Sequence, residues 1–144
     1  YIYILNVRFA GDIHYVSELD ETVLDYRIPS MILQPLVENA VNHGIRGIEW
    51  PGEIRLRVQD KGGQIEIRVE DNGKGISPLR LEEIRATLDQ PDTLESEHIG
   101  LNNINTRLKL YYGKEYGLRI DSQEGIGTAL SLHLPRASQD KGEV

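Results

Sequence analysis

The chain has 144 residues, of which 39% are hydrophobic and 27% are charged, and these values are typical of one globular domain with a single core. It contains no cysteine, which excludes disulfides, thiolate metal sites and thiol catalysis, and no apolar run approaches the roughly 20 residues that a membrane-spanning helix requires. The formal net charge of -7 argues against sequence-independent binding to nucleic acid, which depends on Lys and Arg.

The N-terminal segments carry the weakest patterns. Residues 1–9 predict the end of a helix, and residues 13–19 carry a strand pattern. Because the chain opens at Tyr1 in mid-pattern, without a signal peptide, we interpret it as a cytoplasmic piece of a longer protein. We expect residues 1–12 to belong to a preceding helix or linker and residues 13–136 to form the domain. The missing part is then the place for a membrane anchor.

Residues 28–44 predict an amphipathic helix. Five apolar residues recur at helical spacing and form one buried face, and these are Leu33, Leu36, Val37, Ala40 and Val41. Gly44 is a helix stop in this interpretation. Since Pro35 cannot donate an intrahelical hydrogen bond, we expect the regular helix to start near it, with residues 29–34 forming a separate turn or an offset first turn.

A hairpin gives the clearest pattern of the chain. Residues 54–58 and 65–69 alternate between apolar and polar side chains, and Lys61-Gly62-Gly63 turns the chain between them. Residues 77–97 are polar and acidic, with a short helical pattern at 81–88, which suggests a mobile lid reaching to about residue 99.

A further helix and a second hairpin complete the chain. Leu101, Ile104, Leu108 and Tyr111 mark the helix, which Gly113 stops. Leu118 and Ile120 begin a strand, a second strand holds Leu130, Leu132 and Leu134, and residues 137–144 form a frayed tail. This order predicts an α+β fold, a two-layer sandwich in which helices cover one face of a mixed, mostly antiparallel sheet.

The turn after the first hairpin is the first candidate site. Its sequence is Asp71-Asn72-Gly73-Lys74-Gly75-Ile76. A buried Asp at a strand end can accept a hydrogen bond from an exocyclic amine such as that of adenine. Gly73 and Gly75 allow a tight backbone that approaches a flat ring. A polar turn that only closes the strand explains the same residues about as well.

The first long helix carries a polar stripe formed by Pro35, Asn39, Asn42 and His43. The amide oxygen of Asn39 is a suitable ligand for Mg²⁺, and Asn42 and His43 lie one turn further, within reach of phosphate oxygens. The bland alternative is a solvated helix face.

Two later segments add weaker signals. His98, Gly100 and Leu101 lead into a helix whose first N–H groups can bind phosphate, although every helix begins with such groups. Thr128 follows a glycine-rich turn, where its hydroxyl can help a carboxylate to bind a base through water. A simple hairpin turn is the alternative.

Together these segments resemble the Bergerat nucleotide-binding fold of gyrase, heat-shock chaperones, mismatch-repair proteins and histidine kinases. Four stretches resemble its N, G1, G2 and G3 boxes, in the family's order, and these are residues 33–44, 71–76, 98–101 and 125–128. Within that superfamily, the residues in these motifs most resemble those of the LytS/YesM-type sensor histidine kinases. That narrower resemblance rests on residues 3–9, 28–29, 34–40, 100–103 and 107–108.

The resemblance implies roles for single residues. Asn39 would coordinate Mg²⁺ on ATP, Asp71 would bind the adenine amine, and Thr128 would support Asp71. Further ATP contacts would come from Asn42, His43, Gly73, Gly75, Ile76, His98, Gly100 and Leu101. Residues 77–99 would form the ATP lid, and Glu38 would orient a ligand or the incoming imidazole, which makes it the candidate catalytic residue.

The chain departs from the family at three positions. The ATPase branches carry a water-activating Glu where this chain has Pro35, so we expect little hydrolysis. A kinase tolerates this change, because its nucleophile is a histidine on another domain. Asn42 stands where many kinases carry a phosphate-binding Lys, and His98 replaces the first glycine of the usual G-x-G.

The resemblance also implies partners. The phosphoacceptor histidine would lie on the protein's own dimerisation domain, since none of His14, His43, His98 and His133 lies in an acceptor pattern. We therefore expect no autophosphorylation of the isolated chain, a monomeric fragment, a homodimeric full-length protein and a response regulator downstream. Two alternatives stay open: a serine kinase of the anti-sigma-factor type, and a nucleotide-sensing module with little catalysis.

Overall fold

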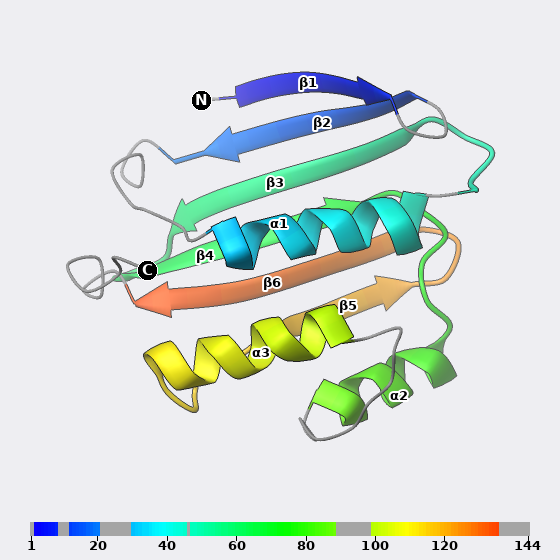
Figure 1. Ribbon diagram of the computed structural model, residues 1–144. Helices are drawn as coiled ribbons and strands as arrows, with labels where there is room; N and C mark the ends of the chain where they lie inside the picture. Colours follow the sequence, from blue (N-terminus) through cyan, green and yellow to red (C-terminus); the bar gives the residue numbers. More distant parts are fainter. Residues whose placement is uncertain (1, 9–11, 21–29, 46, 89–98, 136–144) are drawn as a thin grey trace.

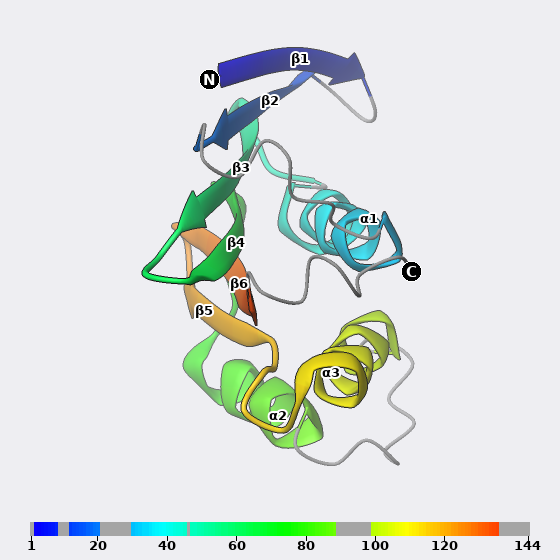
Figure 2. The same cartoon turned by 90° about the vertical axis from the view of Figure 1, so that its left-hand side faces the viewer.

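The computed structural model describes residues 2–8, 12–20, 30–45, 47–88 and 99–135, which form a sheet with helices on one face (Figures 1 and 2). Its six strands lie in the order β1-β2-β3-β4-β6-β5, and every neighbouring pair is antiparallel except β2 with β3. The strands are β1 (Ile2–Arg8), β2 (Asp12–Leu19), β3 (Gly52–Asp60), β4 (Gln64–Asp71), β5 (Arg119–Gln123) and β6 (Gly127–Pro135). The helices are α1 (Ser30–Asn39), the π-helix η2 (Ala40–Ile45), α2 (Pro78–Leu88) and α3 (Ile99–Tyr112). The predicted α+β sandwich with a mixed, mostly antiparallel sheet is confirmed.

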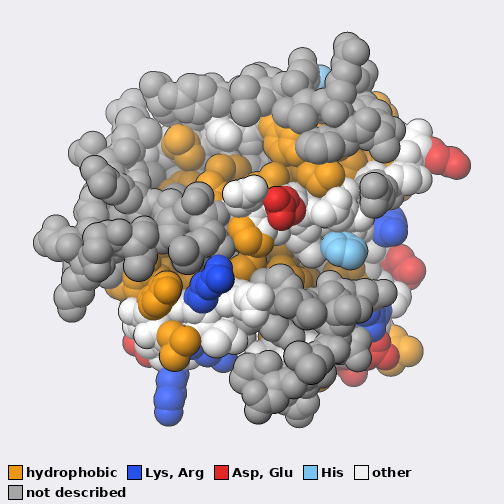
Figure 3. Space-filling model, in the orientation of Figure 1, with side chains coloured by type: hydrophobic (Ala, Val, Ile, Leu, Met, Phe, Trp, Pro, Cys, Tyr) orange, Lys and Arg blue, Asp and Glu red, His pale blue; other side chains and the backbone are white. Residues whose placement is uncertain are grey.

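The core lies between the sheet and the helices. Alternate residues of the central strands point inward and are almost fully buried, as are three helix residues; these are Ile65, Ile67, Val69, Leu130, Leu132, Leu134, Leu36, Ile104 and Leu108. On the helix-covered face, hydrophobic side chains show between the helices, and Lys and Arg side chains show near α3 (Figure 3). Within the described residues, no helix combines the length and apolar character needed to cross a membrane.

The first segment is a strand, so the prediction of a helix end over residues 1–9 is wrong. Ile2–Arg8 pairs with β2 along its whole length, and residues 13–19 form a strand as predicted. The segment is a short, nearly continuous apolar run, which does not distinguish helix from strand by its period. Its β-branched and aromatic residues suit a strand, and the pairing partner decides the outcome.

The first long helix differs from its prediction at both ends. It is helical from Ser30 and contains Pro35 in its interior, so the expectation of a regular helix starting near Pro35 is wrong. Gly44 does not stop the helix either, because the π-helix η2 continues to Ile45. The missing N–H of Pro35 leaves one carbonyl of the preceding turn without its usual helical partner, a local defect that the packing of Leu36 and Ala40 in the core outweighs.

The remaining elements follow the sequence patterns. The hairpin β3–β4 turns at Lys61-Gly62-Gly63, and the helical pattern at 81–88 becomes α2, whose first turn carries a cap from the Ser77 hydroxyl to the Arg80 N–H. Helix α3 ends one residue before Gly113, as predicted, but Tyr111 is exposed and Tyr112 packs against the core in its place. Residues 89–98 of the expected lid and the tail 136–144 lie outside the described residues.

Candidate nucleotide-binding site

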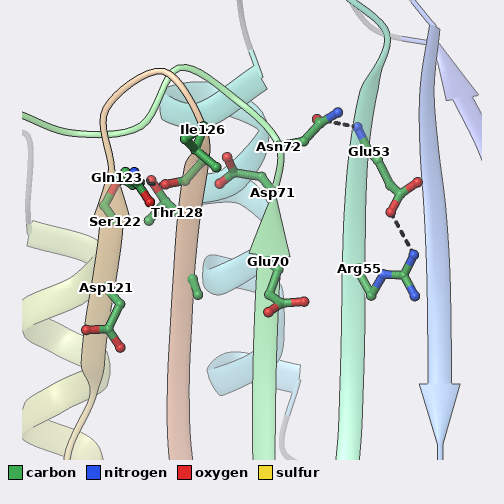
Figure 4. A pocket seen from close by; sticks show the side chains of 12 residues that line it. Glu53, Arg55, Glu70, Asp71, Asn72, Asp121, Ser122, Gln123, Ile126 and Thr128 are labelled. Atoms are coloured by element: carbon green, nitrogen blue, oxygen red, sulfur yellow. Dashed lines mark hydrogen bonds and ion pairs between the residues drawn. The ribbon is translucent and has the colours of Figure 1, made fainter.

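Asp71 ends the central strand β4 and faces the helices. Cross-strand pairing aligns it with Ile54 of β3 on one side and with Thr128 of β6 on the other, and Thr128 is paired in turn with Ser122 of β5. Because strand side chains alternate, this row continues the buried face of Val69 and Leu130. The row therefore ends the apolar core with three polar side chains side by side (Figure 4).

The carboxyl group of Asp71 is held by backbone donors. The N–H of Gly73 donates to Oδ1 at 2.8 Å, and the backbone N–H of Thr128 also donates to the carboxylate. Burial raises the pKa of Asp71 from its ordinary value of 3.8 to about 6, and the two backbone hydrogen bonds oppose this increase only in part. The site thus contains an acceptor that water reaches poorly.

The π-helix packs its backbone directly against this carboxylate. A Cβ atom added to Gly44 would lie 2.5 Å from Oδ2 of Asp71, and one added to Gly73 would overlap the carbonyl of Gly44. That same carbonyl accepts a hydrogen bond from the N–H of Lys74 at 3.1 Å. Only glycine fits at positions 44 and 73, and their contact joins the first long helix to the turn after β4.

Ser122 fixes the other side of this turn. Its hydroxyl accepts a hydrogen bond from the N–H of Ile76 at 2.8 Å, donates to the carbonyl of Gly127 at 2.9 Å and lies 2.9 Å from the Thr128 hydroxyl. The N–H of Gly125 donates to the Lys74 carbonyl at 2.7 Å. The turn after β4 is therefore bonded to the β5–β6 turn by both backbone and side chain.

Asn72 ties the start of the turn to β3. Its Oδ1 accepts from the Glu53 N–H at 2.8 Å (Figure 4). Its Nδ2 donates to the Pro51 carbonyl at 3.0 Å, and its own carbonyl accepts from Nε1 of Trp50 at 2.7 Å. With bonds to β3, β5 and η2, residues 72–76 form a rigid shelf beside Asp71.

A cavity of about 350 Å³ lies on the helix side of this shelf. Five predicted site residues line it, namely Asn39, His43, Gly75, Ile76 and Leu101. Three charged residues that sequence reasoning did not select line it as well, namely Lys74, Arg80 and Glu124. Of these, Arg80 is paired with Glu83 at 2.8 Å, so Lys74 and Glu124 are the charged lining residues for which no ion pair is seen within the described part of the chain.

The other predicted residues lie elsewhere. Asp71 and Thr128 line a separate open cavity of about 470 Å³ at the strand ends, which shares no lining residue with the first cavity and is also lined by the outward-facing row of Arg55, Glu70 and Asp121 (Figure 4). Asn42 and Glu38 are exposed and line neither cavity; the Glu38 carboxylate accepts a hydrogen bond from Nε2 of Gln34 at 3.1 Å. Gly100 is in the first turn of α3, and His98 lies outside the described residues.

Two site residues that were not predicted, Ser122 and Lys74, have sequence positions from which their place in the site could have been predicted. Ser122 continues the alternation of Leu118 and Ile120, so the period of two places its side chain on the inner face, beside Thr128. Lys74 stands between the two glycines of the turn. By contrast, the contact of Gly44 with Asp71 joins positions far apart in the chain, and no local pattern predicts it.

Comparison with known sequences agrees with this geometry. Residues 25–138 match the family described as "Histidine kinase-, DNA gyrase B-, and HSP90-like ATPase". Over 94% of its length the chain is 38% identical to an uncharacterized sensor-like histidine kinase of Staphylococcus epidermidis and 36% identical to the sensor histidine kinase YpdA of Escherichia coli. It spans only 26% and 22% of those two proteins.

Solved structures show the same fold. The catalytic domain of the histidine kinase ThkA superposes on 86% of this chain and 80% of its own, with a TM-score of 0.60 and 20% identity. The blue-light-activated histidine kinase EL346 of Erythrobacter litoralis superposes on 90% of this chain and 37% of its own, with a TM-score of 0.61 and 19% identity. With the family match over most of its length, the chain belongs to the histidine kinase-, DNA gyrase B- and HSP90-like ATPases.

Proposed function

We propose that this chain is the catalytic domain of a two-component sensor kinase, which binds Mg-ATP and donates the γ-phosphate to a histidine on a separate dimerisation domain. The family match implies ATP binding, and the similar sensor histidine kinases support the phosphotransfer and a downstream response regulator. Residues 77–99 remain the proposed ATP lid, of which the structure describes Ser77, α2 and Ile99.

The half-buried carboxylate of Asp71, with its raised pKa, is the observation that carries the proposal. A strand end that only turns the chain gains nothing from a buried acid, whose burial raises its pKa to about 6. Perturbed acids of this kind gather at functional sites. An adenine amine supplies a hydrogen-bond donor to this carboxylate, which burial partly shields from water. Gly73 and Gly75 keep the shelf free of side chains beside the base.

The 350 Å³ cavity suits the triphosphate. Lys74 and Arg80 bring positive charge to it, in place of the phosphate-binding Lys that the resemblance expects at Asn42. The amide oxygen of Asn39 is a hard donor in the same cavity, so it fits Mg²⁺, which would neutralise charge on the phosphate oxygens when bound. The first N–H groups of α3 add anion-binding donors at Gly100.

Pro35 favours phosphotransfer over hydrolysis. It lies inside α1 one turn before Asn39, where the ATPase branches of the resemblance carry a water-activating Glu, and it has no group to accept a proton. Glu38, on the exposed side of the helix, keeps its proposed role of orienting a ligand or the incoming imidazole.

Calorimetric titration with a non-hydrolysable ATP analogue, with and without Mg²⁺, tests the site. Asp71→Asn should abolish binding, and Asn39→Ala should remove the gain in affinity that Mg²⁺ gives. Asp60→Asn is the matched control, because Asp60 also ends a strand of the same hairpin and accepts a backbone hydrogen bond, from Gly63, at the opposite end. Parental affinity in Asp71→Asn refutes the adenine assignment.

A nucleotide-sensing module with little catalysis is the second candidate, favoured by the exposed positions of Asn42 and Glu38. Incubation with labelled ATP and the separately supplied dimerisation domain of the full-length protein distinguishes the two. Label on the histidine of that domain supports the kinase, and ATP binding without transfer supports the module.

A further inference from the structure

A second groove, of about 510 Å³, lies along the outer edge of the sheet. It is bounded by α2, by α3 and the turn that follows it, and by β5, which is the last strand in the sheet order and has no strand beyond it among the described residues. The groove shares only Ile120 with the 350 Å³ cavity, and none of the proposed nucleotide contacts line it.

The floor of the groove is firmly built. Asn105 is 5% exposed; its Nδ2 donates to the carbonyl of Leu88 at 2.9 Å, and its Oδ1 accepts from the N–H of Leu118 at 2.8 Å. A Cβ atom on Gly117 would meet both Oδ1 of Asn105 and Cε of Lys109, so the absence of a side chain there lets the lysine stem lie against the groove wall.

Arg85 closes one end. Its guanidinium donates to the carbonyl of Ile120 at 2.7 and 3.2 Å and forms an ion pair with Asp121 at 3.1 Å. Side chains thus already satisfy the N–H of Leu118, just before β5, and the carbonyl of Ile120 in β5, which limits the addition of a further strand at this edge.

The groove carries an excess of positive charge. Four basic residues line it, Arg85, Lys109, Lys114 and Arg119, against the two acids Glu115 and Asp121. Asp121 is taken by Arg85, and the carboxylate of Glu115 lies against Gly113. Within the described part of the chain, Lys109, Lys114 and Arg119 form no ion pair, and all three are exposed.

On strands β3 and β4, by contrast, basic side chains form ion pairs. There Arg55 and Arg57 both pair with Glu18, Lys61 pairs with Glu66, and Arg68 pairs with Glu70. On a chain of net charge -7, the basic residues of β3, of β4 and of the turn between them are matched by carboxylates, whereas three of the basic residues that line this groove are not.

We propose that this groove binds an acidic segment of a partner protein. The three unmatched cations come from separate places, Lys109 from α3, Lys114 from the following turn and Arg119 from β5. A small phosphate is held by donors that converge on one point, often with backbone N–H groups, whereas the N–H of Leu118 is already used by Asn105. An extended chain bearing several carboxylates reaches all three cations and complements the local charge.

Fluorescence anisotropy with a labelled peptide of alternating glutamate and glycine tests the proposal. At low salt the peptide should bind saturably, added salt should weaken it, and the same peptide with glutamine should not bind. The double variant Lys109→Glu/Arg119→Glu should lower affinity at least about tenfold, because attraction becomes repulsion at two points. Lys61→Glu, on the outer face of the sheet, is the matched control and should bind as the parent does.

Thermal unfolding and binding of the ATP analogue check that each variant is folded. If the double variant unfolds, Lys114→Gln and Lys109→Gln, which only remove charge from exposed positions, should each weaken the peptide. Absence of peptide binding to the parent overturns the proposal, as does an equal loss in Lys61→Glu. Inorganic tripolyphosphate that binds the groove as tightly as the peptide overturns the assignment to a protein partner.

Discussion

Replacing Asp71 by asparagine should stabilise the ligand-free protein at neutral pH. Burial raises the pKa of this carboxyl from 3.8 to about 6, so the folded state binds its proton more tightly than the unfolded chain does. With about 1.36 kcal/mol for each pKa unit, the ionised carboxylate lowers the free energy of unfolding at pH 7 by about 3 kcal/mol. Asparagine carries no charge, but it has one side-chain oxygen fewer to accept hydrogen bonds from backbone N–H groups, which costs about 1 kcal/mol. The net gain in the free energy of unfolding is therefore about 2 kcal/mol.

Urea unfolding between pH 4 and pH 8 measures this gain. Well below pH 3.8 the carboxyl is protonated in both states and the charge cost is absent; the cost grows between about pH 3.8 and about pH 6 and stays nearly constant above. The advantage of Asp71→Asn should therefore increase with pH over that window. Asp121→Asn controls for the removal of a carboxylate whose side chain is 69% exposed. A difference that does not change with pH, or a parent more stable than Asp71→Asn at pH 7, refutes the reasoning.

Three further substitutions test the packing around the site. Gly44→Ala should lower the free energy of unfolding by about 1–3 kcal/mol and weaken the ATP analogue, because the new Cβ would lie 2.5 Å from Oδ2 of Asp71. Urea unfolding and calorimetry measure both effects, and parental nucleotide affinity would contradict the packing argument. Ser122→Ala should speed hydrogen exchange at the Ile76 amide, which loses its acceptor; an unchanged rate would show that the amide has another partner. Asn105→Leu should destabilise the fold by about 2–5 kcal/mol in urea, since it leaves one N–H at β5 and one carbonyl of α2 unpaired; a cost near zero would mean that water replaces both bonds.

The sequence predicts the sheet best where side chains alternate and the partner strand is close in the chain. The hairpin at Lys61-Gly62-Gly63 shows this, since its two strands carry matching periods of two and a turn that only a few residue types adopt. The same period predicts that Asp71 faces inward with Val69, and the structure confirms this.

The failures arise where distant contacts decide. The strand Ile2–Arg8 has an ambiguous apolar pattern, and its pairing with β2 settles the structure. Pro35 argues locally for a helix start, but burial of the surrounding face keeps it inside α1. Gly44 suits a helix stop by its backbone freedom, yet what requires glycine there is the carboxylate of Asp71. A local pattern does not report a contact between positions 44 and 71.

The place of β4 in the sheet has a consequence for synthesis on the ribosome. Its pairing with β3 is local, but its other neighbour is β6, which is separated from it in the chain by α2, α3 and β5. Pairings between distant segments form late, because loop closure must come first. Asp71 therefore gains its partner Thr128 only after nearly the whole domain has left the exit tunnel, and a nascent chain that ends before β6 lacks one side of the proposed adenine site.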